Sequence, residues 1–235
     1  VGGWADTRGF YTATTKGDCS VNTAGINTLA DSAVSFIRQY GFDGVDIDYE
    51  YPTSMKDAGN PNDFPLSNQC RAKLFANYEV LMKTLRARLD NAGNEDGRKY
   101  MLTIASPASA YLLRGMENFQ VTQYLDYVNL MTYDFHGAWN HFVGHNAALF
   151  DNNADPELSH WGVYTQTQFG GIGYLNAAWS AHYFRGALAA GKINVGVPYY
   201  TRGWQGVSGG SHGLGGKAAL PSQNECQPGT GGSTI

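Results

Sequence analysis

The segment 43–50 restricts the possible folds of this 235-residue chain more than any other stretch. It reads Asp-Gly-Val-Asp-Ile-Asp-Tyr-Glu, and successive side chains of a β-strand point to opposite faces. The apolar residues at positions 45, 47 and 49 would share one face, and the carboxylates Asp46, Asp48 and Glu50 the other. Neighbouring acids would stand roughly 6.6 Å apart, so part of the row must keep its protons at neutral pH.

A row of like charges is unfavourable on a surface strand and costs more in a core without partners. It is expected where chemistry needs a carboxylic acid at pH 7, and Glu50, the last acid of the row, is the candidate. Two other interpretations stay open, a solvated edge strand and a magnesium or calcium site. Collinear side chains of one strand rarely surround a cation without ligands from elsewhere, so we expect neither a metal nor a cofactor.

Periodic apolar residues predict strands and helices that alternate along the chain. The expected strands are 1–4, 43–50, 101–107, 127–134 and 193–200, and the expected helices are 22–41, 74–93, 116–125 and 174–190. The segments 5–22, 51–67 and 135–173 are expected to be long loops. Strands that alternate with helices predict an α/β fold with a parallel sheet, here an incomplete (β/α)8 barrel, since only five of its eight strands are found.

The composition narrows the classes of partner. A net charge of −4 with 15% charged residues argues against nucleic-acid and anionic-membrane surfaces, which need clustered Lys and Arg. No apolar run reaches the roughly 18 residues of a membrane helix. Aromatic residues make up 13% of the chain, and their rings suit the apolar faces of sugars. We therefore expect an uncharged partner and a chain that binds neither nucleic acid nor membrane.

The acidic segment 43–50 resembles the DxxDxDxE signature of glycoside hydrolase family 18, the chitinases. Three further segments agree with this resemblance. Gly2-Gly3-Trp4 is similar to the third-strand motif of the family, 131–134 to its sixth-strand motif and 197–204 to the end of its seventh strand. The resemblance runs through almost the whole chain and looks closest to secreted bacterial chitinases.

The resemblance implies a domain organisation. Residues 1–205 would be part of the catalytic (β/α)8 barrel, about strands 3 to 7, and 206–235 would begin an α+β insertion after strand 7. The Gly-, Ser- and Pro-rich composition of 206–235 agrees with this boundary. The final-strand Trp of the family, which forms the floor under the sugar to be cleaved, has no counterpart here.

The resemblance also implies a mechanism and its residues. Glu50 would protonate the leaving oxygen while the N-acetyl oxygen of the substrate attacks, with retention of configuration. Asp48 would orient the acetamido group, Asp46 would share a proton with Asp48, and Tyr133 would hydrogen-bond the acetamido group. Tyr133 could instead be an ordinary barrel tyrosine. The substrate-binding candidates are Trp4, Met131, Asp134, Trp139, Tyr200 and Arg202, although Asp134 could be a loop cap, Met131 could serve packing, and large rings also fill barrel tops.

Histidines and cysteines are the other residues of the chain that commonly bind metals. His136, His141, His145 and His160 lie in one expected loop, but their spacing matches no zinc motif and no cysteine joins them. The three cysteines, Cys19, Cys70 and Cys226, read either as free thiols or as one disulfide with a leftover. In the barrel interpretation Cys19 and Cys70 lie in loops after adjacent strands at one face, so we expect a disulfide between them, with Cys226 unpaired.

These observations lead to one functional expectation and two alternatives. We expect a secreted, monomeric hydrolase that cleaves β-1,4-N-acetylglucosamine linkages in chitin or chitooligosaccharides. An endo-β-N-acetylglucosaminidase of the same family that acts on glycans is one alternative. A chitinase-like lectin that binds without cleaving is the other, although such proteins usually lose the acid and Glu50 is present.

Overall fold

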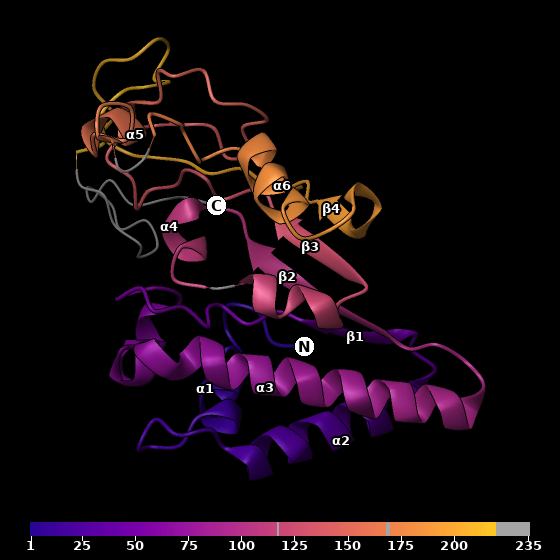
Figure 1. Ribbon diagram of the computed structural model, residues 1–235. Coiled ribbons are helices and arrows are strands. Elements are labelled where there is room, and N and C mark those ends of the chain that lie inside the picture. Colours follow the sequence, from indigo (N-terminus) through magenta and orange to yellow (C-terminus); the bar gives the residue numbers. More distant parts are fainter. Residues whose placement is uncertain (117, 168–169, 220–235) are drawn as a thin grey trace. The chain divides into compact units, whose positions relative to one another are not determined.

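The computed structural model describes residues 1–116, 118–167 and 170–219, and in these the chain forms two compact units (Figure 1). The first unit contains Val1–Pro107, Tyr111–Asn129 and Phe184–Asn194. The second contains Ala108–Ala110, Leu130–Tyr183 and the residues from Val195 onward. Each unit is described by itself below.

Four strands form one sheet in the order β1-β2-β3-β4. Their bounds are Gly44–Ile47 for β1, Met101–Pro107 for β2, Tyr127–Met131 for β3 and Ile193–Val195 for β4. β1 and β2 pair in parallel, with Val45 beside Leu102 and Ile47 beside Ile104, as alternating strands and helices predict. The expected first strand is reduced to one parallel bridge between Gly2 and Asp48. The five predicted strands are therefore four strands and a bridge in the described residues.

Two helices of the first unit pack on the β1–β2 pair, one against each strand, and a third helix packs on these two (Figure 1). Helix α2, Thr23–Tyr40, begins at the predicted cap Asn22, whose Oδ1 accepts a hydrogen bond from Gly25 N, and ends at Gly41 in a left-handed conformation. Its Ile26, Ala30 and Ile37 are buried. This confirms the helix predicted from the apolar spacing.

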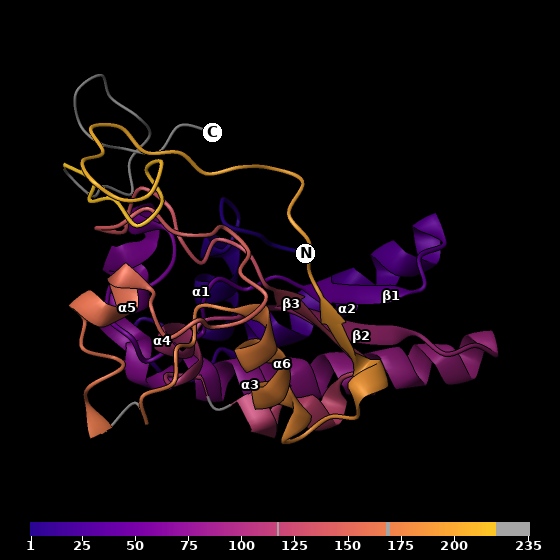
Figure 2. The same cartoon turned by 90° about the horizontal axis from the view of Figure 1, so that it is seen from above.

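Helix α3, Phe64–Asp96, is 33 residues long and runs along β2, as Figure 2 shows from above. Its leucines at 74, 81, 85 and 89 are almost completely buried, which is the stripe that predicted it. The prediction was too short at the amino-terminal end because residues 64–73 carry no regular apolar stripe. Pro65 starts the helix there, since proline is compatible with the first turn.

The structure corrects several other expected boundaries. The expected loop 5–22 contains helix α1, Arg8–Thr14, and the expected loop 135–173 contains helix α5, Pro156–His160. Both helices are one or two turns long, too short to show an apolar period. The helix expected over 116–125 is wrong, since that region has the 3₁₀ turns Asn118–Gln120 and Thr122–Tyr124 after helix α4, Ala110–Leu113. Helix α6, Ala177–Arg185, is shorter than expected.

The strands also end earlier than the sequence suggested. β1 stops at Ile47, β3 at Met131 and β4 at Val195, so the functional side chains that follow lie after the carboxyl ends of strands. That is where active sites of parallel α/β folds are built. No helix in the described part of the chain combines the length and the apolar run that crossing a bilayer requires.

Candidate active site

The acidic segment of the first unit follows the predicted alternation only in part. Val45, Ile47 and Tyr49 are buried and Asp46 is exposed, which confirms the two faces over β1. Because β1 ends at Ile47, Asp48 and Glu50 do not continue the strand as a simple row. Glu50 is instead buried, with 8% of its surface exposed.

Asp46 belongs to a line of polar side chains that crosses the sheet. It accepts hydrogen bonds from Thr103 Oγ1 on β2 and from Asn129 Nδ2 on β3, the latter at 2.9 Å. Asn129 Oδ1 accepts in turn from Asn194 Nδ2 on β4, also at 2.9 Å. Thr103, Asn129 and Asn194 were not predicted. Their signal in the sequence is one polar residue at the solvent-facing position of each strand, which becomes meaningful only once the register is known.

Asp48 is a half-buried carboxyl with few partners. Its Oδ1 is buried and has no hydrogen-bond partner among the described residues. Burial, and then the negative charge of Asp46, raise the pKa of Asp48 above its usual value. The predicted sharing of a proton between Asp46 and Asp48 stays a prediction, and the raised pKa is the condition it requires.

The glycine pair next to Trp4 lets the chain come close to Asp48. Gly3 N donates to Asp48 O at 2.8 Å, and a Cβ at Gly2 would lie 2.4 Å from that same oxygen. Gly2 has a φ of 99°, a conformation that residues with a Cβ rarely adopt. Trp4 itself is 46% exposed, and its carbonyl accepts from Asn60 Nδ2 at 3.2 Å.

Helix α1 fixes the backbone on which Glu50 stands. Glu50 N donates to Thr7 Oγ1 at 3.1 Å, and Thr7 Oγ1 donates to Gly3 O at 2.9 Å. The hydroxyl of Tyr11 donates to Glu50 O at 3.4 Å and accepts from Tyr51 N at 3.2 Å. Burial raises the pKa of Tyr11 to about 12, so this hydroxyl keeps its proton at neutral pH. Thr7 and Tyr11 are positioning residues that sequence reasoning missed, because α1 was expected to be a loop.

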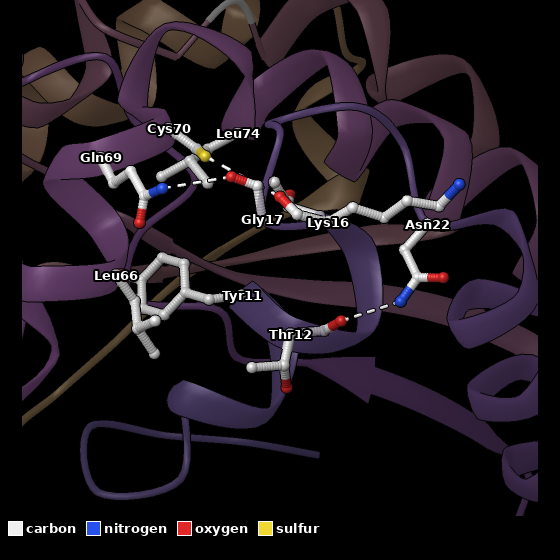
Figure 3. Close-up of a pocket in the computed structure, with 10 residues that line it drawn as sticks. Tyr11, Thr12, Lys16, Gly17, Asn22, Leu66, Gln69, Cys70 and Leu74 are labelled. Atoms are coloured by element: carbon white, nitrogen blue, oxygen red, sulfur yellow. Dashed lines mark hydrogen bonds between the residues drawn. The ribbon is translucent and has the colours of Figure 1, made fainter.

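A cavity of about 460 Å³ lies in the same unit, lined by α1, the turn after it and the first turns of α3 (Figure 3). Its lining includes Tyr11, Lys16, Asn22, Leu66 and Gln69, and none of the acids of 43–50. Gln69 Nε2 donates to Gly17 O at 3.1 Å, and Asn22 Nδ2 donates to Thr12 O at 3.0 Å. These bonds hold the turn after α1 against α2 and α3.

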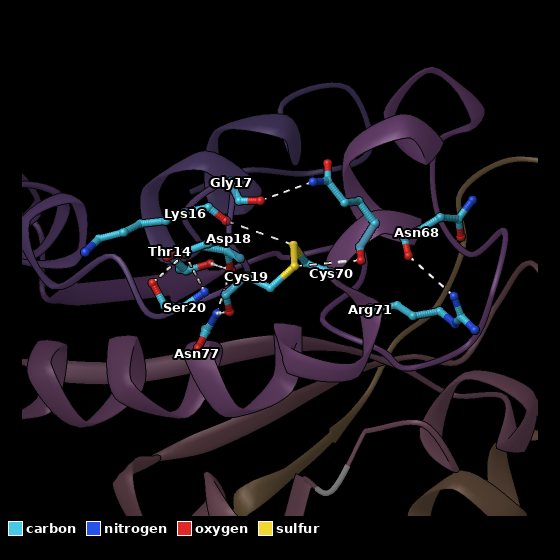
Figure 4. The surroundings of a disulfide bond; sticks show 12 residues. Thr14, Lys16, Gly17, Asp18, Cys19, Ser20, Asn68, Cys70, Arg71 and Asn77 are labelled. Carbon is cyan, nitrogen blue, oxygen red and sulfur yellow. Dashed lines mark hydrogen bonds between the residues drawn. A yellow bond between two sulfur atoms is a disulfide. The ribbon is translucent and has the colours of Figure 1, made fainter.

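The structure joins Cys19 and Cys70, the predicted pair, in a disulfide with their Cα atoms 5.2 Å apart (Figure 4). Cys19 lies in the turn after α1, but Cys70 lies in α3 and not in a loop as expected. Asn77 of α3 supports the junction by donating to Thr15 Oγ1 at 2.9 Å. The segment that positions Glu50 is thus tied covalently to the longest helix. Cys226 lies outside the described residues.

The second unit brings five predicted residues together after β3 and β4. Arg202 Nε donates to Asp134 Oδ1 at 2.7 Å, and the guanidinium lies 5.2 Å from the ring centre of Trp139 and 5.1 Å from that of Tyr200. The rings of Tyr133 and Tyr200 meet edge to face at 6.0 Å. We call Tyr133, Asp134, Trp139, Tyr200 and Arg202 the ring cluster. Met131, the last residue of β3, is half-buried.

The electrostatics of the ring cluster differ from those of the acidic segment. The bond to Asp134 raises the pKa of Arg202, so the guanidinium stays charged. Burial, and then the charge of Asp134, raise the pKa of Tyr200 and keep its hydroxyl neutral. A charged Arg beside aromatic faces favours the cation–π geometry seen here. The ring cluster is thus a half-buried platform of neutral rings around one ion pair.

One unpredicted residue, Asn146, shapes the chain around Asp134. Its Oδ1 accepts from Asp134 N at 2.9 Å, and its Nδ2 donates to Tyr200 O at 3.3 Å. Asp134 has a φ of 56°, which aspartate tolerates better than most residues. A Cβ at Gly196 would lie 2.8 Å from the ring of Tyr133, so only glycine leaves room for that ring.

The described residues offer no cation site of the usual kind. Within 1–116, 118–167 and 170–219, no three or more His, Cys, Asp or Glu side chains gather as possible metal ligands. Of the four histidines, the rings of His141 and His160 lie 4.7 Å apart and tilted to each other, and His136 pairs with Asp155. These contacts give three of the four histidines partners within the protein.

The family profile described as "Glycosyl hydrolases family 18" matches residues 1–231. The chain belongs to glycosyl hydrolase family 18. The fold of that family is a (β/α)8 barrel, and the four-stranded sheet of this chain is an open part of it. That the segment from 206 onward begins an insertion stays a prediction; in its described part, Ser208 pairs with Lys217 and Ser211 with Leu214 in antiparallel bridges.

Several family 18 proteins are similar to this chain. Chitinase A1 of Niallia circulans is 37% identical over all of the chain, which covers 29% of that protein. The crystal structure of a family 18 chitinase from Chromobacterium violaceum is 56% identical with a TM-score of 0.91, over 94% of this chain and 35% of that one. A family 18 N-acetylglucosaminidase from Paenibacillus barengoltzii is 29% identical with a TM-score of 0.71, over all of this chain and 57% of that one. The chain thus spans about a third of the length of the first two.

Proposed function

We propose that this chain is part of the catalytic barrel of a secreted, monomeric chitinase, which hydrolyses β-1,4-N-acetylglucosamine linkages in chitin and chitooligosaccharides. The observation that carries the proposal is the pair Asp48 and Glu50, one a half-buried carboxyl with a raised pKa and the other a buried acid on a backbone fixed by α1. Membership of family 18 and the similarity to Chitinase A1 support it.

The proposed mechanism uses one protein acid and the substrate as nucleophile. Glu50 donates its proton to the leaving glycosidic oxygen, and the N-acetyl oxygen of the sugar on the non-reducing side attacks the anomeric carbon. The resulting oxazolinium is opened by water, which Glu50 deprotonates, so the configuration is retained. Several closely spaced acids on one segment agree with this route better than with two carboxylates on opposite walls of a cleft.

The neighbours of Glu50 would prepare the attack. Asp48 would accept the N–H of the acetamido group and stabilise the positive charge that develops on it. Its raised pKa allows it to hold a proton shared with Asp46 before the substrate arrives, and to release it when the acetamido group binds. Tyr133 would donate its hydroxyl to the acetamido oxygen and keep it aimed at the anomeric carbon.

The remaining candidates would bind the sugar chain. Trp139 and Tyr200 offer ring faces, and Arg202 and Asp134 offer charged hydrogen-bonding groups beside them. Trp4, at the start of the chain, and Met131, at the end of β3, would add apolar contacts. Such a mixture of rings and a few polar groups is typical of carbohydrate sites.

A release assay with a fluorogenic chitooligosaccharide in the full-length protein tests the proposal. We expect hydrolysis in wild type, inhibition by a thiazoline analogue of the cyclic intermediate, and no loss of rate after exhaustive chelation. Binding without release would make the protein a lectin. If calcium or magnesium restored hydrolysis after chelation, the acidic segment would have to be interpreted as a metal site.

Partially de-acetylated chitosan tests the nucleophile. A glucosamine unit has no carbonyl oxygen, so the new reducing ends should carry N-acetylglucosamine almost exclusively. Frequent glucosamine at those ends, or a glycosyl ester trapped on Asp134, would show that an enzyme carboxylate attacks.

A second candidate function follows from the similarity to the Paenibacillus N-acetylglucosaminidase. An enzyme of that kind would release N-acetylglucosamine units, or cleave protein-linked glycans as an endo-β-N-acetylglucosaminidase, with the same acid. Comparing rates on chitin polymer, chitobiose and a high-mannose glycopeptide separates these substrates.

A further inference from the structure

His136 is a buried histidine in the loop that carries Asp134 and Trp139 of the ring cluster. It lies two residues after Asp134, and only 2% of its surface is exposed. Its Nδ1 lies 3.0 Å from His145 O, and its Nε2 lies 3.0 Å from Asp155 Oδ2. The side chain therefore joins the segment 134–146 to the residue that precedes α5.

Both partners of the imidazole are acceptors, and this determines its charge. A backbone carbonyl and a carboxylate offer lone pairs only, and a neutral imidazole carries one N–H, so it could satisfy one of them. An imidazolium carries two, so Nδ1 can donate to the carbonyl while the positive charge of the ring pairs with the carboxylate beside Nε2. Glu157 adds a second negative charge from the α5 side, and the segment itself faces the ring with the carbonyl of His145.

The titration of the two partners agrees with this geometry. Burial alone would lower the pKa of His136, but the pairing with Asp155 and the bond to His145 outweigh it and raise the pKa above its ordinary value. Burial would raise the pKa of Asp155, and the pairing with His136 lowers it below its ordinary value. These opposite shifts favour an ion pair between the two buried side chains, and loss of one partner would leave an unpaired buried charge.

The segment 134–146 closes tightly around this ring. A Cβ at Gly144 would lie 2.3 Å from the His136 ring. Phe135 N donates to Asn146 O at 3.1 Å, next to the bond from Asp134 N to Asn146 Oδ1. These hydrogen bonds hold the two ends of the segment together. Trp139 lies between those ends in the sequence.

The start of α5 holds the other side of the contact. Asp155 caps α5 through Oδ1, which accepts from Glu157 N at 2.9 Å, so its Oδ2 is free to face His136. The buried carboxylate of Glu157 reaches back to the segment and accepts from His141 N at 2.7 Å and Phe142 N at 3.0 Å. The segment is thus fixed at two points to a rigid turn.

We propose that His136 is a positioning residue which works as an imidazolium: paired with Asp155, it holds the segment 134–146 in the conformation that presents Asp134 and Trp139 to the sugar chain. The positioning part of the inference depends on the proposed function of the ring cluster. The charge state of His136 and its hold on the segment 134–146 do not depend on that function.

The charge state can be measured without any activity. Nitrogen-15 NMR of the histidine side chains in the full-length protein should find both His136 nitrogens protonated at pH 7.5. In Asp155→Asn, which keeps an acceptor but removes the charge, His136 should lose its proton at a lower pH than in wild type. A neutral His136 at pH 7.5 in wild type would overturn the proposal.

The hold on the segment is read by hydrogen exchange and by kinetics. In His136→Gln we expect faster amide exchange at Asp134 and Phe135, and a KM for a chitooligosaccharide about tenfold higher with a much smaller change in kcat, the size of one buried charge-assisted hydrogen bond. His182→Gln is the matched control and should change neither. In wild type KM should rise as pH passes the raised pKa of His136, because the pairing is present below that pKa and lost above it.

The outcomes separate this inference from the proposed function. If the protein cleaves no chitin but His136 is charged and protects the segment, the proposed function fails and the structural part stands. If His136→Gln and Asp155→Asn leave amide exchange, KM and its pH dependence unchanged, the proposal is wrong even in an active chitinase.

Discussion

Asp48 in the first unit and Asp134 in the second are both aspartates, but their environments are opposite. Asp48 has no hydrogen-bond partner for its buried Oδ1 among the described residues and faces the charge of Asp46. Asp134 binds the guanidinium of Arg202. One carboxyl is prepared to hold a proton, and the other is engaged in an ion pair with a guanidinium. The difference teaches that chemistry and binding require different surroundings, which the residue type alone does not reveal.

The two regions also differ in how they are held. Glu50 stands on a backbone fixed by Thr7 and Tyr11, and the disulfide ties that helix to α3. The ring cluster is held by side chains that contact one another, with Asn146 and His136 behind them. Substitutions of Glu50 and Asp48 should therefore act mainly on kcat, and substitutions of Asp134 and Arg202 mainly on KM.

Glu50→Gln should give the largest effect. The change removes the proton donor with little change in volume, so kcat should fall by about 10³-fold or more while chitooligosaccharide binding is kept. Fluorogenic release and calorimetric binding measure the two. Glu79→Gln on α3 is the control and should behave as wild type. Retained turnover in Glu50→Gln would show that another residue is the general acid.

Replacing both Cys19 and Cys70 by serine should destabilise the first unit strongly. The bond closes a separation of 51 residues, which on the chain-entropy model stabilises the fold by about 4 kcal/mol. Urea unfolding of the oxidised protein and the double variant measures the difference. Near-equal unfolding curves would show that the contacts between α1 and α3 suffice without the bond.

Asp48→Asn and Asp134→Asn compare the two carboxylates directly. We expect Asp48→Asn to lower kcat by about 10²-fold, because electrostatic stabilisation of the transition state is lost, and Asp134→Asn to act mainly on KM by about tenfold. Steady-state kinetics on one substrate separate the two. Equal effects of the two substitutions on kcat would contradict the proposed difference between Asp48 and Asp134.

The raised pKa of Asp48 adds a stability prediction with a definite sign. The folded state binds this proton more tightly than the unfolded state, so wild-type stability falls as pH rises from the unfolded pKa through the folded one. Asp48→Asn should therefore raise Tm at neutral pH and lose that advantage in acid. A lower Tm at pH 7 than wild type would contradict the assigned direction.

Thr7→Val should give the smallest effect. It removes the acceptor for Glu50 N without changing the shape of the side chain, so kcat should fall by about tenfold, as one buried donor loses its partner. Thr12→Val on the exposed face of α1 is the matched control. Unchanged kcat in Thr7→Val would mean that Tyr11 alone positions the acid.

The sequence by itself determined the elements with strong periods and the acids with a regular spacing. Val45 and Ile47 are buried beside exposed Asp46 because alternation is a property of any half-buried strand, and α2 begins at Asn22 and ends at Gly41 because caps are local. The motif at 43–50 likewise predicted the family, which the match to the family 18 profile confirms.

Only the tertiary structure decided what surrounds those acids. Helix α1 is too short to form a period, yet Thr7, which precedes it, and its Tyr11 reach Glu50 across 43 and 39 residues of sequence. Strand register brings Thr103 and Asn129 to Asp46. The course of the chain between β3 and α5 brings His136 to Asp155. Sequence patterns report burial, which each residue experiences alone, whereas a pKa or a hydrogen bond depends on which distant residues the packed chain brings within about 3 Å.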